Sequence, residues 1–277
     1  VITDNADNAE MKVEENRAAM VFNGWSDHRM GADLLCYMNG YQDPRREKMF
    51  TQVEITETVG GKPTKVSGFA GIRIGIDVVN KESVIDRYSK PIISTASPYP
   101  WMNAAEVTFL RAEGALRGWD MGGTAKSFYE QGVRMSFEEN NAAGVDDYLA
   151  DHTSTPGAFA DNVGSDNYTF SSRVTPAWDD NAGFEAQLER IITQKWIANY
   201  PDGPEGWSEY RRTGYPEVIP VVRNSSNGTI DTQLQVRRLP YTRDEKINNA
   251  SGVASGISAL GGKDTGGAKL WWDKKSR

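Results

Sequence analysis

Two neighbouring helical patterns separated by a glycine-containing turn place the strongest constraint on the fold. The sequence NAAEVTFLRAEGALRGW at 103–119 repeats apolar residues at intervals of three and four, the period of a helix with a buried face. TAKSFYEQGVRMSFEEN at 124–140 has a similar pattern, and the intervening DMGG supplies glycines of the kind that end helices. We therefore predict a tetratricopeptide-type helix pair at 103–140. The small residues that would let its two antiparallel helices approach closely are Ala112, Ala125 and Gly132.

A single helix pair of this type cannot bury both of its faces, because in repeat proteins each pair stacks on its neighbours. The remainder of the sequence contains no second copy of the pattern. We therefore expect contiguous exposed apolar surface on the helices at 103–140. In the complete protein this surface would be covered by a missing part of a longer precursor, or by another copy of the chain.

The rest of the chain alternates between shorter helical patterns and irregular segments. Helices are predicted at 26–38, 184–200 and 205–212, and the Gly60–Gly61 pair within the β-rich stretch 51–97 predicts a hairpin. Residues 141–183 are rich in loop-forming residues. The predicted fold is mainly α, with a tetratricopeptide-type helix pair, long irregular loop-rich regions and a small β hairpin.

Two parts of the chain differ in composition. We predict an irregular mixed α/β part at 1–97 and a helical part at 98–277 that contains the helix pair, the two parts forming one intertwined unit.

The charge balance and the scarcity of two residue types exclude several classes of protein. Lys and Arg number 31 and Asp and Glu 38, which gives a net charge of −7 and argues against general nucleic-acid binding. With two histidines and one cysteine, the chain cannot form a Cys₄ or Cys₂His₂ zinc site or an internal disulfide. No apolar run approaches the ~18 residues that a membrane-spanning helix needs. We expect no metal and no cofactor, and Cys36 is predicted to be a small buried residue.

Six segments, in consistent order along the chain, resemble one protein family. The strongest is ITQKWIANYPDGPEGWSEYRRTGYPEVIP at 192–220, which resembles the C-terminal signature of SusD/RagB-like outer-membrane lipoproteins. The upstream segments ITDNADNA and DPRREKMF resemble the SusD-like nutrient-binding branch in particular. The other three segments are AEVTFLRAEGALRGW, RLPYTRDEKINNA and KLWWDKK at 105–119, 238–250 and 269–275.

This resemblance implies a fold, a location and a role. The chain would be the C-terminal half of a family member, in which tetratricopeptide-like helix pairs support a loop-rich face. The complete protein would face outward from the bacterial outer membrane, held by a lipid anchor on the missing N-terminal part. It would bind glycans or related nutrients and deliver them to a SusC-type TonB-dependent transporter, without catalysing a reaction.

Three aromatic residues in polar loops are candidates for contact with a sugar. A flat ring stacks on the C–H face of a sugar, and short polar side chains beside it hydrogen-bond the hydroxyls. The same composition also describes a hydrophobic plug under a loop. The candidate ligand-binding residues are Trp25, Asp27, Arg29, Tyr168, Trp178 and Asp180. The aromatic residues predicted instead to be core, or to pin the C-terminus, are Trp119, Trp196, Trp207, Tyr210, Tyr215, Trp271 and Trp272.

Two other functions remain as alternatives. A helical-repeat adapter would bind only another protein. A glycoside hydrolase would need two carboxyl groups facing each other ~5–9.5 Å apart, and adjacent acids such as Asp146–Asp147 and Asp179–Asp180 usually point in different directions. The arginine pairs Arg211–Arg212 and Arg237–Arg238 are predicted to hold loops and helix ends by hydrogen bonds rather than to bind anions.

Overall fold

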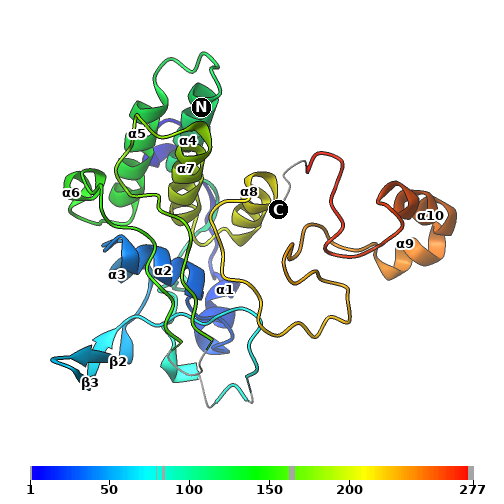
Figure 1. Ribbon diagram of the computed structural model, residues 1–277, viewed down its shortest axis with the longest axis horizontal. Coiled ribbons are helices and arrows are strands. Elements are labelled where there is room, and N and C mark those ends of the chain that lie inside the picture. Colours follow the sequence, from blue (N-terminus) through cyan, green and yellow to red (C-terminus); the bar gives the residue numbers. More distant parts are fainter. Residues whose placement is uncertain (1, 79, 83–84, 162–165, 274–277) are drawn as a thin grey trace.

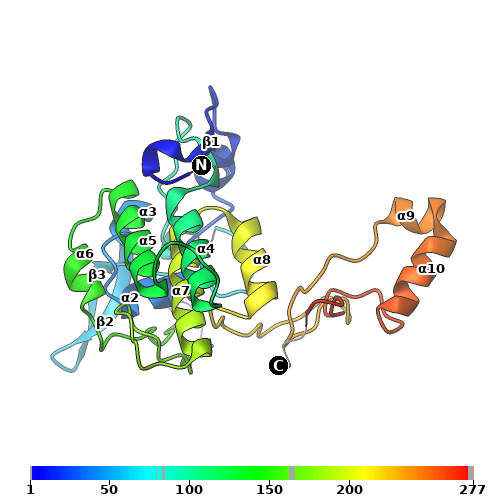
Figure 2. The same cartoon turned by 90° about the horizontal axis from the view of Figure 1, so that it is seen from above.

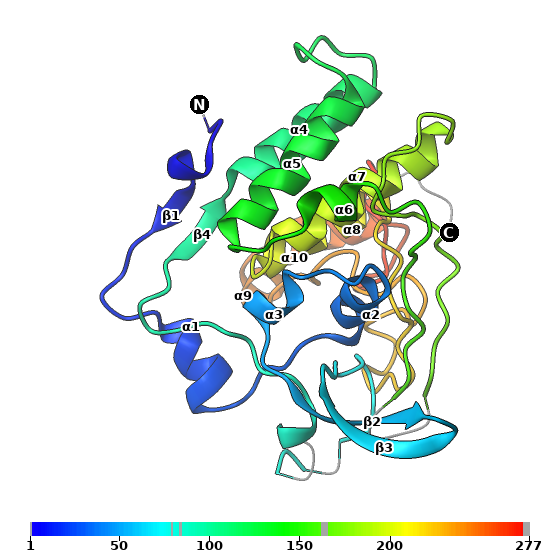
Figure 3. The same cartoon turned by 90° about the vertical axis from the view of Figure 1, so that its left-hand side faces the viewer.

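The computed structural model describes residues 2–78, 80–82, 85–161 and 166–273, and its architecture is mainly helical. Four helices form the body: α4 (Ala104–Leu116), α5 (Ala125–Glu139), α7 (Phe184–Ala198) and α8 (Gly203–Thr213). Figure 3 shows α2 and α3 below this group, and the α1 and β1 segments to one side of it. The shorter helical elements are η1 (Asn5–Asp7), α1 (Arg17–Ala19), the π-helix η2 (Met20–Gly24), α2 (Ala32–Gly40), α3 (Arg46–Met49), η3 (Ile85–Arg87), α6 (Val145–Leu149), α9 (Arg243–Asn248) and α10 (Ala250–Ala259).

The helices α4 and α5 form the predicted antiparallel pair, and local sequence signals define where each begins. The side chain of Asn103 accepts a hydrogen bond of 2.7 Å from the backbone N–H of Glu106 and caps α4. Thr124 and Ser127 form a reciprocal capping box at the start of α5. Gly132 of α5 lies directly against the buried Phe109 ring of α4. The prediction that small residues permit a close approach of the two helices is confirmed at this position.

Replacing Gly132 by alanine is expected to destabilise the fold. A Cβ at this position would lie 2.9 Å from the Phe109 ring, which has no free space to move into because it is fully buried. Overpacking of this kind costs about 1–3 kcal/mol, and the better helix propensity of alanine returns about 1 kcal/mol. We expect a net loss of up to about 2 kcal/mol in urea unfolding. The exposed neighbour Gln131, changed to alanine, should leave the stability unchanged within about 0.5 kcal/mol.

Strands contribute two small antiparallel sheets. The strands β2 (Val53–Val59) and β3 (Lys62–Gly68) pair along their whole length, from Val53 with Gly68 to Val59 with Lys62. Gly60 and Gly61 form their turn with φ of 57° and 80°, the left-handed conformation that a tight hairpin requires. The predicted hairpin is therefore confirmed. The second sheet pairs β1 (Ala9–Met11) with β4 (Tyr99–Met102), which joins the start of the chain to the segment before α4.

One buried cluster joins residues from both predicted parts of the chain. Cys36, which is 2% exposed, lies in it together with Tyr37 of α2, Phe109 of α4 and Ile191 of α7, so the prediction of a buried cysteine is confirmed. The division at residues 97–98 stays a prediction, and the shared core favours the interpretation of a single intertwined unit.

Some sequence predictions about the fold are wrong. The helix expected at 26–38 is α2, which begins only at Ala32, and Ser26 has a φ of 57° that no helix contains. Trp119 is 65% exposed rather than core, because α4 ends at Leu116 and Gly118, with φ of 81°, turns the chain off the buried stripe. Trp271 is 82% exposed and does not pin the C-terminus. The last two residues of the KLWWDKK segment lie outside the described residues.

The segment after α8 forms an arm, here residues 224–273, whose helices α9 and α10 stand apart from the body in two perpendicular views (Figures 1 and 2). At the base of the arm, Arg237 and Arg238 hold loops and a helix end by hydrogen bonds, as predicted. Arg237 pairs with Asp273 at 2.6 Å and donates to the backbone oxygen of Arg211 at 2.7 Å. Arg238 pairs with Asp264 at 2.7 Å. The hydrogen bond to Arg211 attaches the arm to α8, and the two ion pairs join segments of the arm to each other.

Candidate binding site

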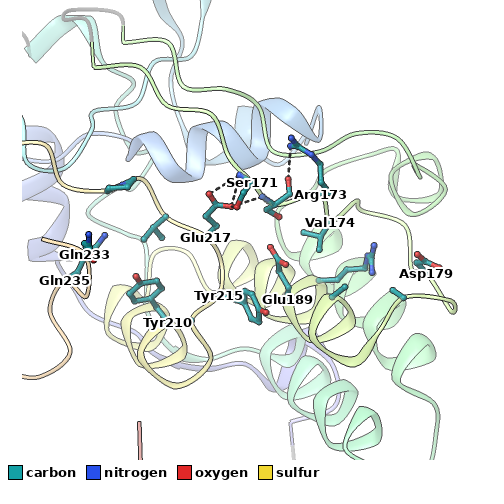
Figure 4. Close-up of a pocket in the computed structure, with 17 residues that line it drawn as sticks. Ser171, Arg173, Val174, Asp179, Glu189, Tyr210, Tyr215, Glu217, Gln233 and Gln235 are labelled. Carbon is teal, nitrogen blue, oxygen red and sulfur yellow. Dashed lines mark hydrogen bonds between the residues drawn. The ribbon is translucent and has the colours of Figure 1, made fainter. Parts of the chain in front are cut away.

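A cavity of about 670 Å³ lies beside α7, where the start of the arm approaches the body. Figure 4 shows Gln233 and Gln235 at one end, Asp179 at the other, and Tyr210, Tyr215 and Glu189 along the helical side. The residues that line it are Ser171, Ser172, Arg173, Val174, Asp179, Ala182, Ala186, Glu189, Arg190, Tyr210, Gly214, Tyr215, Glu217, Val218, Pro220, Gln233 and Gln235.

Two half-buried tyrosines provide flat rings to the cavity. Tyr210 belongs to the last turn of α8, and Gly214 ends this helix in the left-handed conformation, with φ of 82°. A residue with a side chain would be strained there, so glycine allows the sharp turn that brings Tyr215 to the cavity wall. The hydroxyl of Tyr215 donates to Glu185 Oε2 at 2.9 Å, which fixes the ring at its edge. Tyr210 is therefore held by the helix, and Tyr215 by the turn at Gly214 and its hydrogen bond to Glu185.

Glu217 is a rigid carboxylate in the opposite wall. Its Oε2 accepts hydrogen bonds from the Ser172 N–H at 2.7 Å and the Ser171 hydroxyl at 2.8 Å, and its Oε1 accepts from the Tyr168 hydroxyl at 2.8 Å. Burial alone would raise the pKa of Glu217, but these hydrogen bonds outweigh it and lower the pKa below its usual value. Burial, with the hydrogen bond to Glu217, raises the pKa of Tyr168 to about 12. The pair therefore stays a neutral phenol and an ionised carboxylate at neutral pH.

The loop that carries Glu217 is fixed from behind. Asp33 of α2 accepts a 2.5 Å hydrogen bond from the Ile219 N–H, and Arg73 donates to the Pro220 oxygen at 2.9 Å. Asp33 is 8% exposed, and its burial raises its pKa to about 6. Because the first 80 residues supply these contacts, the geometry of the cavity depends on both parts of the chain.

Hydrogen-bonding capacity remains in the cavity wall. Ser172 and Arg190 are 7% and 5% exposed, yet Ser172 Oγ and Arg190 Nη1 have no hydrogen-bond partner within the described part of the chain. The Arg190 Nε donates to the Thr175 backbone oxygen at 3.0 Å, so this guanidinium is only partly satisfied. An unpaired buried polar group costs about 1–3 kcal/mol.

The six predicted site residues fall into three groups with different surroundings. Tyr168 does not itself line the cavity, but it hydrogen-bonds Glu217, which does. Trp25 is 57% exposed, as a stacking surface requires, and Lys81 pairs with Asp27 and contacts the Trp25 backbone oxygen. Arg29 donates to the Ile85 oxygen at 2.7 Å, so it holds the neighbouring segment.

Trp178 and Asp180 form the third group, and the structure corrects their interpretation. Trp178 is 6% exposed, packs on Tyr129 with 5.3 Å between ring centroids, and donates from Nε1 to Asp180 Oδ1 at 2.9 Å. A buried ring cannot stack on a sugar, so this tryptophan is a hydrophobic plug under its loop. Asp180 accepts that hydrogen bond and pairs with Lys126 at 3.3 Å.

Most of the cavity residues are not predicted by the sequence. Tyr210 and Tyr215 are predicted to be core because they lie in a helical signature, yet both are only half-buried. The GYP sequence directly after α8 was the available signal, since a glycine helix stop turns the next side chain away from the helical stripe. Glu217, Gln233 and Gln235 carry no local pattern. They are brought together by contacts that link distant segments of the chain.

The adjacent acid pairs do not form an opposed catalytic pair. Asp146 is exposed and pairs with Arg134 at 2.7 Å, whereas Asp180 pairs with Lys126 and Asp179 accepts from the Asn181 N–H at 2.9 Å. Throughout the described ranges, no three His, Cys, Asp or Glu side chains are grouped so that they could hold a metal ion. None of the helices in these ranges combines the length and apolar character that crossing a membrane requires.

Comparison with known proteins decides the family. A family model described as "Susd and RagB outer membrane lipoprotein" matches residues 1–273. The chain belongs to the SusD-like family. This description names a lipoprotein of the outer membrane and no catalytic activity.

Solved structures of SusD homologues agree with the fold. A homologue from Bacteroides thetaiotaomicron is 46% identical with a TM-score of 0.89, covering 100% of this chain and 58% of its own. A chitin-binding homologue from Flavobacterium johnsoniae is 42% identical with a TM-score of 0.86, covering 100% and 56%. The chain therefore spans a little more than half the length of these SusD homologues. No curated protein sequence matches it.

Proposed function

We propose that this SusD-like chain binds glycans or related nutrients at the outer-membrane surface without chemically altering them. The observation that carries the proposal is the cavity beside α7, which combines two tyrosine rings, a fixed carboxylate and two amide side chains. Ligand sites of this size are typically mostly apolar with a few placed polar groups. The chitin-binding activity stated for the Flavobacterium johnsoniae homologue supports a polysaccharide as the ligand class.

The geometry supports binding by stacking and hydrogen bonding. Tyr210 and Tyr215 offer ring faces for the C–H surface of a sugar, and small apolar residues such as Ala186 and Val218 also line the cavity. Gln233 and Gln235 can both donate and accept hydrogen bonds at the cavity end. Since this type of binding needs neither a metal nor an opposed acid pair, the proposal includes no catalysis.

Family membership extends the proposal to the complete protein. We propose that it is anchored by a lipid and faces outward, and that it passes its ligand to a SusC-type TonB-dependent transporter. The family description as an outer-membrane lipoprotein supports the location. The transfer step would need a protein–protein surface separate from the cavity, and co-purification with the transporter from membranes tests it.

An exposed apolar face on α4 favours a second candidate, a protein-binding adapter. Leu110 is 39% exposed and Trp119 65%, and both line a groove of about 620 Å³ together with Val107 and Met121. This exposed surface supports the expectation of contiguous apolar surface on the helices at 103–140. The adapter would use this groove and leave the cavity beside α7 without a ligand.

Binding to soluble polysaccharides separates the two candidates. We expect glycol chitin, soluble starch, hydroxyethylcellulose or mannan to retard the protein in affinity gels, and Tyr215→Ala to weaken that binding roughly tenfold because a stacked ring is lost. Tyr215→Phe keeps the ring and should retain most of the affinity. Trp119→Ala should bind glycans like the wild type.

Three results would contradict this proposal in different ways. Unchanged migration on every polysaccharide would favour the adapter. Loss of binding in Trp25→Ala together with unchanged binding in Tyr215→Ala would move the site to the exposed tryptophan before α2. Release of soluble sugar from any polysaccharide would restore the hydrolase alternative.

A further inference from the structure

The cavity end opposite Asp179 is formed by the arm, through one tight turn at residues 231–235 (Figure 4). Asp231 organises this turn: its Oδ1 accepts hydrogen bonds from the Gln233 N–H at 2.8 Å and the Leu234 N–H at 2.7 Å. Its backbone oxygen accepts from the Gln235 N–H at 2.8 Å. The turn is therefore defined by its own hydrogen bonds although it lies outside every helix and strand.

The body of the molecule holds this turn in place. The Trp207 Nε1 of α8 donates to the Val236 oxygen at 2.7 Å, directly after the turn. Arg211, one helical turn later, stacks its guanidinium 3.8 Å from the Trp207 ring and donates to the Arg237 oxygen at 3.2 Å. Tyr210 lies on the same helix, so its position relative to the turn at 231–235 is fixed across the cavity.

Gln235 has an unusual backbone conformation for its residue type. Its φ is 55°, in the left-handed region that favours glycine, and a non-glycine residue there costs of order 1 kcal/mol. Glycine would fit this position better, yet the chain places a glutamine whose side chain lines the cavity. A local conformational cost of this kind is expected where a side chain is needed for function.

From these observations we infer that Gln233 and Gln235 are specificity-determining residues of the proposed glycan site, a conclusion that rests on the proposed function. Each amide offers both a donor and an acceptor, which matches the hydroxyl and acetamido groups of uncharged sugars. A site built to hydrogen-bond such groups rejects analogues that lack them, because its own polar groups are then left unpaired. The tyrosines bind sugar rings of any kind, and Gln233 and Gln235 discriminate between sugars.

Substitution by glycine separates recognition from stability. Gln235→Gly removes both the amide and the conformational cost, so we expect a protein at least as stable as the wild type that binds roughly five- to tenfold more weakly by titration calorimetry. The matched control is Asn227→Gly. Asn227 has a φ of 52° and lies outside the cavity, so this change relieves a similar cost and should leave the affinity unchanged.

Selectivity provides the second measurement. Gln233→Ala and Gln235→Glu should change the ranking of glycol chitin, starch, hydroxyethylcellulose and mannan, with losses that differ at least threefold between polymers. An equal loss on all polymers would indicate general damage to the site and would overturn the inference. So would wild-type affinities in Gln235→Gly while Tyr215→Ala still loses binding, a result that leaves the proposed function intact. If the wild type binds none of the polymers, the proposed function and this inference fail together.

Discussion

Replacing Lys195 by methionine is expected to lower the free energy of unfolding by about 3–5 kcal/mol, because three carboxyl groups around it, two buried and that of Glu205 half-buried, would lose their shared cation. Lys195 is 1% exposed in α7, and its Nζ lies 2.7 Å from Glu205, 2.9 Å from Glu209 and 3.6 Å from Glu106. Burial alone would lower the pKa of Lys195, but the carboxylates outweigh burial and raise it. The lysine therefore stays charged and joins α4, α7 and α8 at one point.

Urea unfolding followed by tryptophan fluorescence measures this loss. The matched control is Lys126→Met, because Lys126 pairs with Asp180 at the surface, where removal of an ion pair costs about 0–1 kcal/mol. Equal effects of the two substitutions would contradict a special role for the buried cluster. The cluster also holds α8, which carries Tyr210 and ends just before Tyr215, so partly folded Lys195→Met should bind polysaccharides more weakly than Lys126→Met.

The regular elements were predictable from the sequence because their signals are local. The pair α4–α5 follows from a helical period on each side of a glycine turn, and the β2–β3 hairpin follows from adjacent glycines between β-rich segments. Both depend on residues within a few positions of each other, so neither required knowledge of the remaining chain.

The exposure of individual aromatic residues was not predictable by the same means. Trp119 was expected to continue the buried stripe of α4, but one left-handed glycine before it directs the chain outward. Trp178 has the polar neighbours of a sugar platform and is nevertheless buried against Tyr129. The side on which such a ring lies depends on a single backbone angle or on a distant partner, and neither leaves a periodic signal.

The residues of the cavity were also not predictable from local sequence, because segments far apart in the chain form its walls. Its walls are joined by side chain to backbone hydrogen bonds between segments far apart in sequence, such as Asp33 with Ile219 and Arg73 with Pro220. Family resemblance located the chain within a fold, but it could not assign Glu217 or Gln235 to one site. Their proximity follows only from the three-dimensional structure.

The carboxylate cluster also predicts a pH dependence that Glu106→Gln should remove. Burial raises the pKa of Glu106 to about 7, with Lys195 opposing the shift and the nearby Glu205 and Asp202 adding to it. In an unfolded chain the pKa of a glutamate is about 4.3. As the pH rises from about 4.5 to 7, the unfolded state therefore releases this proton first, and the contribution of Glu106 to stability falls across that interval.

The measurable quantity is the difference in unfolding free energy between Glu106→Gln and the wild type. At pH 5 Glu106 is mostly protonated in the folded protein and resembles the neutral amide, whereas at pH 8 the wild type carries a buried charge that the variant lacks. Each unit of pKa shift corresponds to about 1.4 kcal/mol. Allowing for relaxation of the site, we expect the unfolding free energy of the variant, relative to that of the wild type, to rise by about 2 kcal/mol between pH 5 and pH 8. Lys126→Met, measured at the same two pH values, should show a constant difference from the wild type. If the difference in unfolding free energy between Glu106→Gln and the wild type were also the same at both pH values, Lys195 would fully offset the cost of burying the Glu106 charge. Glu106 would then be ionised throughout the range.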